Sequence, residues 1–368
     1  MKYLISGGGT GGHIFPAVSI ANALRELDPS CEILFVGALG RMEMERVPQA
    51  GYSIIGLPVR GFDRSKPWRN VRVLIDLLRS MWRARQIVRD FRPDVGIGVG
   101  GYASGAAMKV AAKMGVPILL QEQNGFAGVT NKLLKDDAKK ICVAYEGMER
   151  FFPKEKLILT GNPVRQNLKN GNKEEAIKYF NQEFGVNFSE ERKTLLIIGG
   201  SLGAGTINQG IIAHLKELTE SNIQLIWQTG KNYFESCQAA ITEETTNIIC
   251  TAFISQMPLA YALADLVISR AGASSISELC LLGKPSILVP SPNVAEDHQT
   301  HNAMALVRKD AAVLVKDINA KEQMVETALT LIQDDEQLRV LHDNILTLAL
   351  PNSARYIAEE VIKLAKNK

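Results

Sequence analysis

The sequence predicts an α/β protein made of two doubly wound domains, and three observations carry that prediction. The chain has 368 residues, more than one typical hydrophobic core accommodates. Short apolar runs alternate with longer amphipathic segments, which is typical of parallel sheets with helices on both faces. A strand, a glycine loop and a helix follow one another twice, in LISGGGTGGH from residue 4 and in LIIGGSLGAGTIN from residue 196. Each copy is expected to begin its own domain.

The expected strands fall into two groups. The first group is YLIS, EILFVG, VGIGVG and VPILLQ, and the second is TLLIIGG, IQLIWQTG, LVISRAG and PSILVP. Residues 167–193 are polar and include one helical pattern, so the boundary is placed near GNPVR, residues 161–165. The stretch after Pro351 has the pattern of a terminal helix.

The composition is that of a soluble globular protein. It is 46% hydrophobic and 22% charged, and the net charge of +3 gives no reason to expect nucleic acid as a partner. The N-terminus lacks a secretory signal pattern, and no apolar run approaches the roughly 20 residues that span a bilayer. Five cysteines lie far apart without CxxC spacing. We therefore expect reduced thiols in a cytoplasmic protein, with neither a zinc site nor a disulfide framework.

The first glycine loop is a candidate phosphate site. A glycine loop before a helix offers backbone N–H groups and the positive end of the helix dipole. Gly7, Gly9 and Gly12 formally match the dinucleotide fingerprint, which also requires an acid after the next strand. That strand ends at Gly37 without a carboxylate, and its counterpart in the second half ends in QTG, so a nicotinamide enzyme is only an alternative. The Walker pattern is absent after both loops.

Seven motifs in order resemble the MurG family over essentially the whole chain. They are GGTGGHIFPA, GVGGYASGAA, QEQNGFAGVTNK, GNPVR, GGSLGA, RAGASSISE and EDHQTHNA. The resemblance implies a GT-B fold, with two Rossmann-like domains facing across a deep cleft and the C-terminal helix returning to the first. The expected domains are 1–163 with 350–368, facing the acceptor and the membrane, and 164–349, binding the donor. QEQN replaces the family's commoner HEQN.

The same resemblance implies an inverting transfer of N-acetylglucosamine from UDP-GlcNAc to undecaprenyl-pyrophosphoryl-MurNAc-pentapeptide, lipid I, which yields lipid II for peptidoglycan. Two other classes remain open. One is another GT-B enzyme that uses a UDP-sugar, such as a lipid glycosyltransferase or a UDP-GlcNAc 2-epimerase. The other is an inactive protein that binds a sugar nucleotide or a lipid.

The donor is expected mainly in the second domain. Ser201 and Arg165 would bind its diphosphate, Glu278 the ribose hydroxyls, Ile254 the uracil through its backbone, and Gln299 the sugar. The alternatives are a surface ion pair for Arg165 and a helix-surface charge for Glu278. The full expected set is Thr10, Gly11, Gly12, Asn124, Arg165, Ser201, Ile254, Ala273, Ser274, Ser275, Glu278 and Gln299.

The reaction needs a base for the acceptor hydroxyl, and His13 is the candidate because its usual pKa is near ~6.5. The alternative roles for His13 are capping the helix and hydrogen-bonding phosphate or sugar, and Glu122 is the alternative base. The two first-domain loops are expected to bind the acceptor pyrophosphate through Gly9, Gly11, Gly12, His13, Gly100, Gly101, Tyr102 and Ser104. A turn that binds nothing is the alternative for GGYASG. No Asp-x-Asp triplet occurs, so neither a metal nor another cofactor is expected.

A basic amphipathic segment predicts membrane contact. Residues 62–92 hold nine Lys or Arg and three acidic residues, with apolar side chains at helical spacing. The expected contacts are Phe62, Trp68, Arg72, Arg79, Trp82 and Arg83, while most of the apolar stripe is expected to be core. This predicts a peripheral protein on the cytoplasmic face of the bacterial cell membrane. Other wall-synthesis and division proteins are expected partners, which would link it to cell shape.

Overall fold

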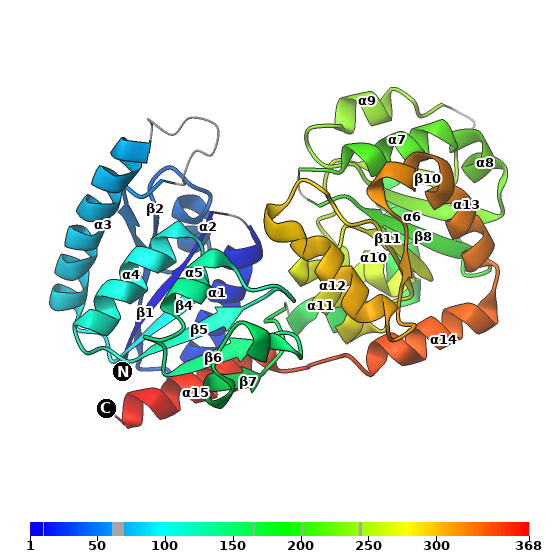
Figure 1. Cartoon of the computed structure of the whole chain (residues 1–368). Coiled ribbons are helices and arrows are strands. Elements are labelled where there is room, and N and C mark those ends of the chain that lie inside the picture. Colours follow the sequence, from blue (N-terminus) through cyan, green and yellow to red (C-terminus); the bar gives the residue numbers. More distant parts are fainter. Residues whose placement is uncertain (10, 61–69, 165, 201, 243–244, 368) are drawn as a thin grey trace. The chain divides into compact units, whose positions relative to one another are not determined.

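The computed structural model describes residues 1–9, 11–60, 70–164, 166–200, 202–242 and 245–367, and leaves the side chains of 70–72, 166–167 and 295 undescribed. The chain divides into two compact units (Figure 1). The first unit is Met1–Val164 with Leu350–Lys368, and the second is Arg165–Ala349. The boundary expected from the sequence places residue 164 in the second domain instead.

The described part of the first unit contains one parallel sheet of seven strands, in the order β3-β2-β1-β4-β5-β6-β7. Its strands are β1 Lys2–Gly7, β2 Glu32–Ala38, β3 Ser53–Leu57, β4 Val95–Gly100, β5 Ile118–Glu122, β6 Lys140–Val143 and β7 Leu157–Leu159. Its α-helices are α1 Gly11–Leu27, α2 Glu43–Gln49, α3 Asn70–Phe91, α4 Tyr102–Lys113, α5 Val129–Leu134 and α15 Ser353–Lys366.

Helices cover both faces of this sheet because alternate strand residues point to opposite sides. Leu4 and Val36 pack with α3, α4 and α5, while Tyr3 and Ile5 pack with α1, α2 and α15. The C-terminal helix α15 lies against α1, so the end of the chain completes the hydrophobic core of the first unit (Figure 1).

The second unit repeats this plan with a six-stranded parallel sheet in the order β10-β9-β8-β11-β12-β13. Its strands are β8 Lys193–Ile198, β9 Ile223–Gln228, β10 Ile248–Thr251, β11 Leu266–Ser269, β12 Ser286–Leu288 and β13 Val313–Leu314. Its α-helices are α6 Lys173–Phe184, α7 Gly205–Ala213, α8 Leu215–Glu220, α9 Phe234–Gln238, α10 Met257–Leu263, α11 Ala273–Leu282, α12 His298–Val307, α13 Ala320–Ile332 and α14 Asp335–Leu346.

The strand orders confirm the doubly wound α/β prediction. In each sheet the winding reverses beside the first strand, between β1 and β4 and between β8 and β11. Ligands of open α/β sheets bind at the carboxyl ends of the strands at such a reversal. Both glycine loops, after Gly7 and after Ile198, therefore lie where binding is expected.

Candidate functional site

The two glycine loops of the first unit are packed directly on one another. Gly100 and Gly101 have φ of +99° and +89°, a region that favours glycine. A Cβ on Gly101 would lie 2.5 Å from the carbonyl oxygen of Gly8. The end of β4 and the loop after β1 therefore form one continuous backbone surface, which extends to the start of α1.

His13 lies on this surface, in the first turn of α1. Its Nδ1 is 3.1 Å from the carbonyl oxygen of Gly8. Because a carbonyl only accepts hydrogen bonds, Nδ1 carries the proton, and in the neutral ring Nε2 has the lone pair. The ring covers Gly100, on which a Cβ would lie 2.8 Å from Nε2. The geometry gives His13 the tautomer that a general base acting through Nε2 requires.

A buried carboxylate that the sequence analysis did not single out lies beneath the same loop. Glu43, the first residue of α2, is 0% exposed. It accepts the N–H of Gly9 at 2.9 Å and the N–H of Ala38 at 2.9 Å. The only sign of this role in the sequence is that a carboxylate, Glu43, follows shortly after β2, a strand that itself ends without a carboxylate.

Glu122 organises the loop that follows β5. Its carboxylate is buried and accepts the N–H groups of Asn124 and Gly128 at 3.1 and 2.9 Å, and the side-chain amide of Asn131 at 2.9 Å. The Asn124 amide also lies 3.4 Å from it. Burial raises the pKa of Glu122, while these hydrogen bonds oppose the shift. Both oxygens are occupied by the loop, so the geometry favours holding Asn124 in place over acting as a base.

Gln121, where the family commonly has histidine, is fully buried in an amide network. Its side chain accepts a hydrogen bond from the amide of Gln123, which also donates to the carbonyl oxygen of Val99 at 2.8 Å. Its own amide lies 3.5 Å from the Asn162 side-chain oxygen. The substitution therefore places a side chain that links β5 to the GNPVR segment.

The second unit contains a cavity of about 530 Å³ at the carboxyl ends of β8 and β11. The glycine loop after β8 and the first turns of α7 and α11 line it. Two helix N-termini that face one cavity favour an anion such as a diphosphate. The lining residues include Gly200, Gly203, Thr206, Tyr233, Arg270, Gly272, Ser275, Ser291 and Gln299.

Arg270 supplies a fixed cation to this cavity. Its side chain is 14% exposed, and its guanidinium pairs with Asp317 and donates to the carbonyl oxygens of Val289 and Pro290 at 3.1 and 3.3 Å. The other oxygen of Asp317 accepts the hydroxyl proton of Thr206 at 3.1 Å. This network ties β11, α7 and the segment after β13 together. The motif RAGASSISE contained Arg270, but the sequence alone did not assign it a role.

Hydrogen bonds orient the side chains of Gln299 and Glu278. The side-chain oxygen of Gln299 accepts the N–H of Ser291 at 2.8 Å, so the amide group is the part that can donate to a ligand. The hydroxyl of Tyr261, itself 1% exposed, donates to Glu278 at 3.0 Å. Glu278 is therefore held by the core of the second unit.

Comparisons with known proteins place the chain in a family. Its residues 3–143 match the N-terminal domain of glycosyltransferase family 28, and residues 194–352 match the C-terminal domain. A Bacteroides thetaiotaomicron protein is 60% identical, with 100% of this chain and 98% of that protein covered. It is named UDP-N-acetylglucosamine--N-acetylmuramyl-(pentapeptide) pyrophosphoryl-undecaprenol N-acetylglucosamine transferase. A Flavobacterium psychrophilum protein of the same name is 50% identical, with 100% and 98% covered.

Among solved structures, MurG of Acinetobacter baumannii is 26% identical with a TM-score of 0.78, covering 98% of this chain and 99% of that one. The chain belongs to the MurG family. Its fold is therefore GT-B, and the resemblance read from the seven motifs is confirmed. A Neisseria meningitidis UDP-GlcNAc 2-epimerase has a TM-score of 0.67 at 16% identity, covering 99% and 100% of the two chains, a likeness of fold alone.

Several residues expected from the MurG resemblance lie outside the described residues. These are Thr10, Phe62, Trp68, Arg165 and Ser201, together with the side chain of Arg72. Gly11 and Gly12 begin α1, and Ala273, Ser274 and Ser275 form the first turn of α11. Ser275 is the member of that turn that lines the cavity.

Two residues expected to bind the acceptor pyrophosphate are already hydrogen-bonded or buried in this structure. The N–H of Gly9 is donated to Glu43 and is therefore not available to phosphate. Ser104 in α4 is 0% exposed, and its hydroxyl oxygen is buried. Tyr102 is 57% exposed at the start of α4 and remains accessible.

Ile254, whose backbone is expected to meet the uracil, has its N–H hydrogen-bonded within the second unit. Its N–H donates to the side-chain oxygen of Gln228 at 3.0 Å, and the Gln228 amide lies 3.3 Å from the carbonyl oxygen of Gly200. A uracil that uses the Ile254 N–H would have to displace Gln228. Gln228 thus links Ile254, the expected uracil contact, to the glycine loop after β8. No sequence pattern predicted this link.

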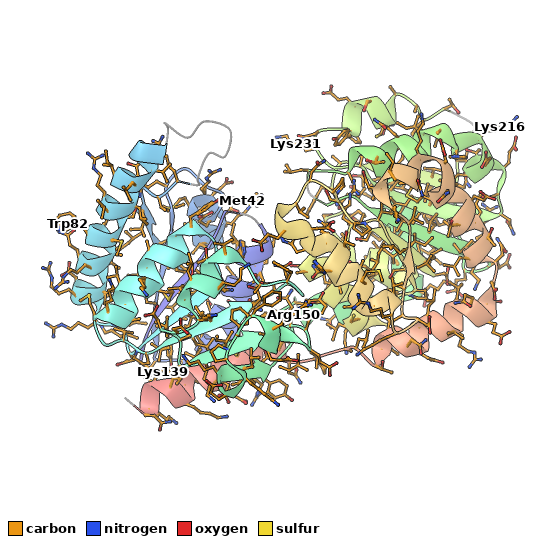
Figure 2. All side chains as sticks on the ribbon, in the orientation of Figure 1. Met42, Trp82, Lys139, Arg150, Lys216 and Lys231 are labelled. Carbon is orange, nitrogen blue, oxygen red and sulfur yellow. The ribbon has the colours of Figure 1, made fainter. Side chains whose placement is uncertain are left out.

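Helix α3 presents apolar side chains outward, contrary to the expectation that most of them are core. Leu74, Ile75, Leu78 and Trp82 are 55%, 44%, 61% and 65% exposed. The core of the first unit instead receives Val73, Leu77, Met81, Ala84, Ile87 and Val88. Figure 2 shows Trp82 projecting from this helix. The prediction that most of the apolar stripe is core is therefore wrong, whereas Trp82 is exposed as expected.

Basic side chains accompany that exposed stripe. Arg79 and Arg83 are exposed on α3, and Arg79 lies 3.9 Å from Asp76, which also pairs with Arg60 at 3.2 Å. Within the described ranges, no helix is long and apolar enough to cross a membrane. Over the same ranges, no group of three or more His, Cys, Asp or Glu side chains is arranged to hold a metal ion.

Proposed function

We propose that this protein transfers N-acetylglucosamine from UDP-GlcNAc to lipid I, the activity named for its relatives at 50–60% identity. The observation that carries the proposal is that identity over the full chain. The two glycine-loop sites, one in each unit at its sheet reversal, supply the groups that such a transfer requires.

The donor diphosphate binds in the cavity of the second unit. The first turns of α7 and α11 and the guanidinium of Arg270 provide donors that are fixed before the reaction. The negative charge that develops on the departing UDP is stabilised by these groups and by Arg165 and Ser201. Gln299 contacts the sugar and Glu278 the ribose. A metal is not needed for this step in the proposed mechanism.

His13 acts as the base on the acceptor side. Its Nε2 takes the proton of the attacking MurNAc hydroxyl, whose oxygen bonds to the anomeric carbon as the bond to UDP breaks, with inversion. Gly11, Gly12 and the Gly100–Gly101 loop offer close backbone approach to the acceptor pyrophosphate. Asn124, held by Glu122, binds the sugar.

The exposed stripe of α3 docks on the cytoplasmic face of the membrane, where the polyprenyl tail of the acceptor lies. Leu74, Ile75, Leu78 and Trp82 enter the interface, and Arg79 and Arg83 contact anionic headgroups. Other wall-synthesis and division proteins are proposed as partners.

The test is an incubation of UDP-GlcNAc with a lipid I analogue, with and without EDTA, followed by mass identification of the products. The proposal predicts UDP and a disaccharide-lipid in both samples. If the sugar nucleotide is converted and no disaccharide forms, the protein is an epimerase and the proposed transferase activity is wrong. A product that disappears with EDTA would keep the transfer but overturn the metal-free departure of UDP.

A further inference from the structure

One peptide unit of the first glycine loop is hydrogen-bonded by a side chain at each end. The Gly8–Gly9 peptide donates its N–H to Oε2 of Glu43 at 2.9 Å. Its carbonyl oxygen accepts from Nδ1 of His13 at 3.1 Å. A buried carboxylate and the candidate base are therefore connected through a single peptide group.

The position of Glu43 is fixed by its surroundings. Its Oε1 accepts the N–H of Ala38 at 2.9 Å, so both oxygens are bonded to backbone. A Cβ on Gly8 would lie 2.1 Å from Oε1, and a Cβ on Gly37 would lie 2.6 Å from Cγ. Glycine at positions 8 and 37 makes room for this carboxylate. The acid that is missing from the end of β2 is replaced by one that α2 directs beneath the loop.

The two hydrogen bonds reinforce one another. A peptide is a resonant unit, so a carboxylate on its N–H increases the negative charge on its carbonyl oxygen. That oxygen then accepts more strongly from His13 and favours the tautomer with the proton on Nδ1. Carboxylates that orient a histidine commonly bind it directly, whereas here a peptide lies between the two groups.

We propose that Glu43 is a positioning residue for the transfer, acting on His13 through the Gly8–Gly9 peptide. This inference rests on the proposed function, in which His13 is the base. When the acceptor proton moves to Nε2 and the electron pair of the breaking bond leaves with UDP, the ring becomes an imidazolium. The carboxylate of Glu43 stabilises that cation through the peptide.

The first test needs no substitution. In ¹⁵N NMR of the wild-type protein with labelled histidine, the neutral ring of His13 is expected as the tautomer protonated on Nδ1. A predominant Nε2–H tautomer would overturn the proposal. Because this readout does not depend on turnover, it stands apart from failure of the proposed function, which would appear as a missing disaccharide product in the wild type.

The second test is a double-mutant cycle. Glu43→Gln replaces one acceptor oxygen by a donor facing a backbone N–H, and is expected to lower kcat roughly 10- to 100-fold. It should also increase the Nε2–H tautomer and leave the Kd for UDP unchanged. Glu45→Gln, the same change at an exposed position of α2, is the matched control and should leave kcat unchanged.

The cycle is completed in a His13→Ala background, where Glu43→Gln should have less than about a twofold further effect on kcat. Equal losses of kcat in both backgrounds would show that Glu43 only supports the loop. Circular dichroism and thermal unfolding identify a variant that fails to fold, in which case the wild-type tautomer measurement decides alone.

Discussion

The imidazole of His13 covers Gly100 so closely that a Cβ at position 100 would lie 2.8 Å from both Cδ2 and Nε2. Gly100 has a φ of +99°, so any side chain there would be strained as well as crowded. The two glycine motifs of the first unit are therefore parts of one site, because the second loop forms the floor beneath the candidate base of the first.

Gly100→Ala is expected to lower kcat at least about tenfold, because the methyl group displaces the His13 ring. Gly115→Ala is the matched control, since Gly115 has a φ of +83° and nothing within 4 Å of an added Cβ. The control should cost about 1–2 kcal/mol of unfolding free energy without a change in kcat. Steady-state kinetics and urea unfolding of both variants check this. Equal kcat values for the two variants would contradict the claim that Gly100 makes room for the His13 ring.

Arg270→Lys is expected to raise the Kd for UDP about tenfold or more. A lysine ammonium cannot reproduce the planar set of donors that binds Asp317 and two carbonyl oxygens while facing the cavity. Isothermal titration with UDP measures the effect. Arg339→Lys is the control, because the Arg339 side chain is 69% exposed and its ion pair with Asp343 is long, at 3.9 Å. An unchanged Kd in folded Arg270→Lys would remove this cation from the donor site.

The double variant Arg79→Glu/Arg83→Glu is expected to weaken binding to anionic liposomes. Each cation near such a surface contributes about 1 kcal/mol, so losing two lowers the partition coefficient at least roughly 30-fold. Trp82→Ser should weaken binding even to neutral liposomes, because it removes apolar contact. Sedimentation with vesicles measures both, and Lys216→Glu/Arg339→Glu in the second unit is the charge-matched control. Wild-type sedimentation of the α3 variants would exclude this helix as the docking surface.

The cysteines are expected to resist alkylation in the folded protein. Burial raises the pKa of Cys142, Cys250 and Cys280 to about 12. The thiolate is the reactive form, so these thiols should stay largely unmodified by iodoacetamide from pH 7 to pH 9. In guanidinium all five should react. Rapid labelling of native Cys142 or Cys280, followed by mass spectrometry, would contradict the burial.

The sequence predicted the elements whose signal is local. The eight apolar runs are β1, β2, β4, β5, β8, β9, β11 and β12, and the terminal helix is α15. Strands β3, β6, β7, β10 and β13 were not among the predicted runs. The last four have four residues or fewer, which gives only a weak pattern. The helical spacing identified the apolar residues of α3, but it did not show which of them face the sheet and which face outward. Which face of a helix packs on the sheet depends on neighbours far away in the chain.

The positions of His13 at the first glycine loop and of Gln299 at the cavity were predictable because each lies in a motif, and their roles stay predictions. The residues that hold those groups were not predictable, because their roles depend on tertiary contacts. Glu43 reaches the first glycine loop from 34 residues away, and Asp317 reaches Arg270 across 47 residues. Neither carboxylate has a local pattern that separates it from an ordinary surface acid.

The central claim is that His13 is the base of an acceptor-side site in the first unit. The most direct test compares wild type with His13→Asn, whose amide can still donate to the Gly8 carbonyl but cannot take a proton. The measurement is the single-turnover rate of disaccharide-lipid formation, with the Kd for UDP-GlcNAc determined in parallel. We predict a rate at least about 100-fold lower with an unchanged Kd. A rate close to wild type would contradict the account and assign the proton transfer to another group.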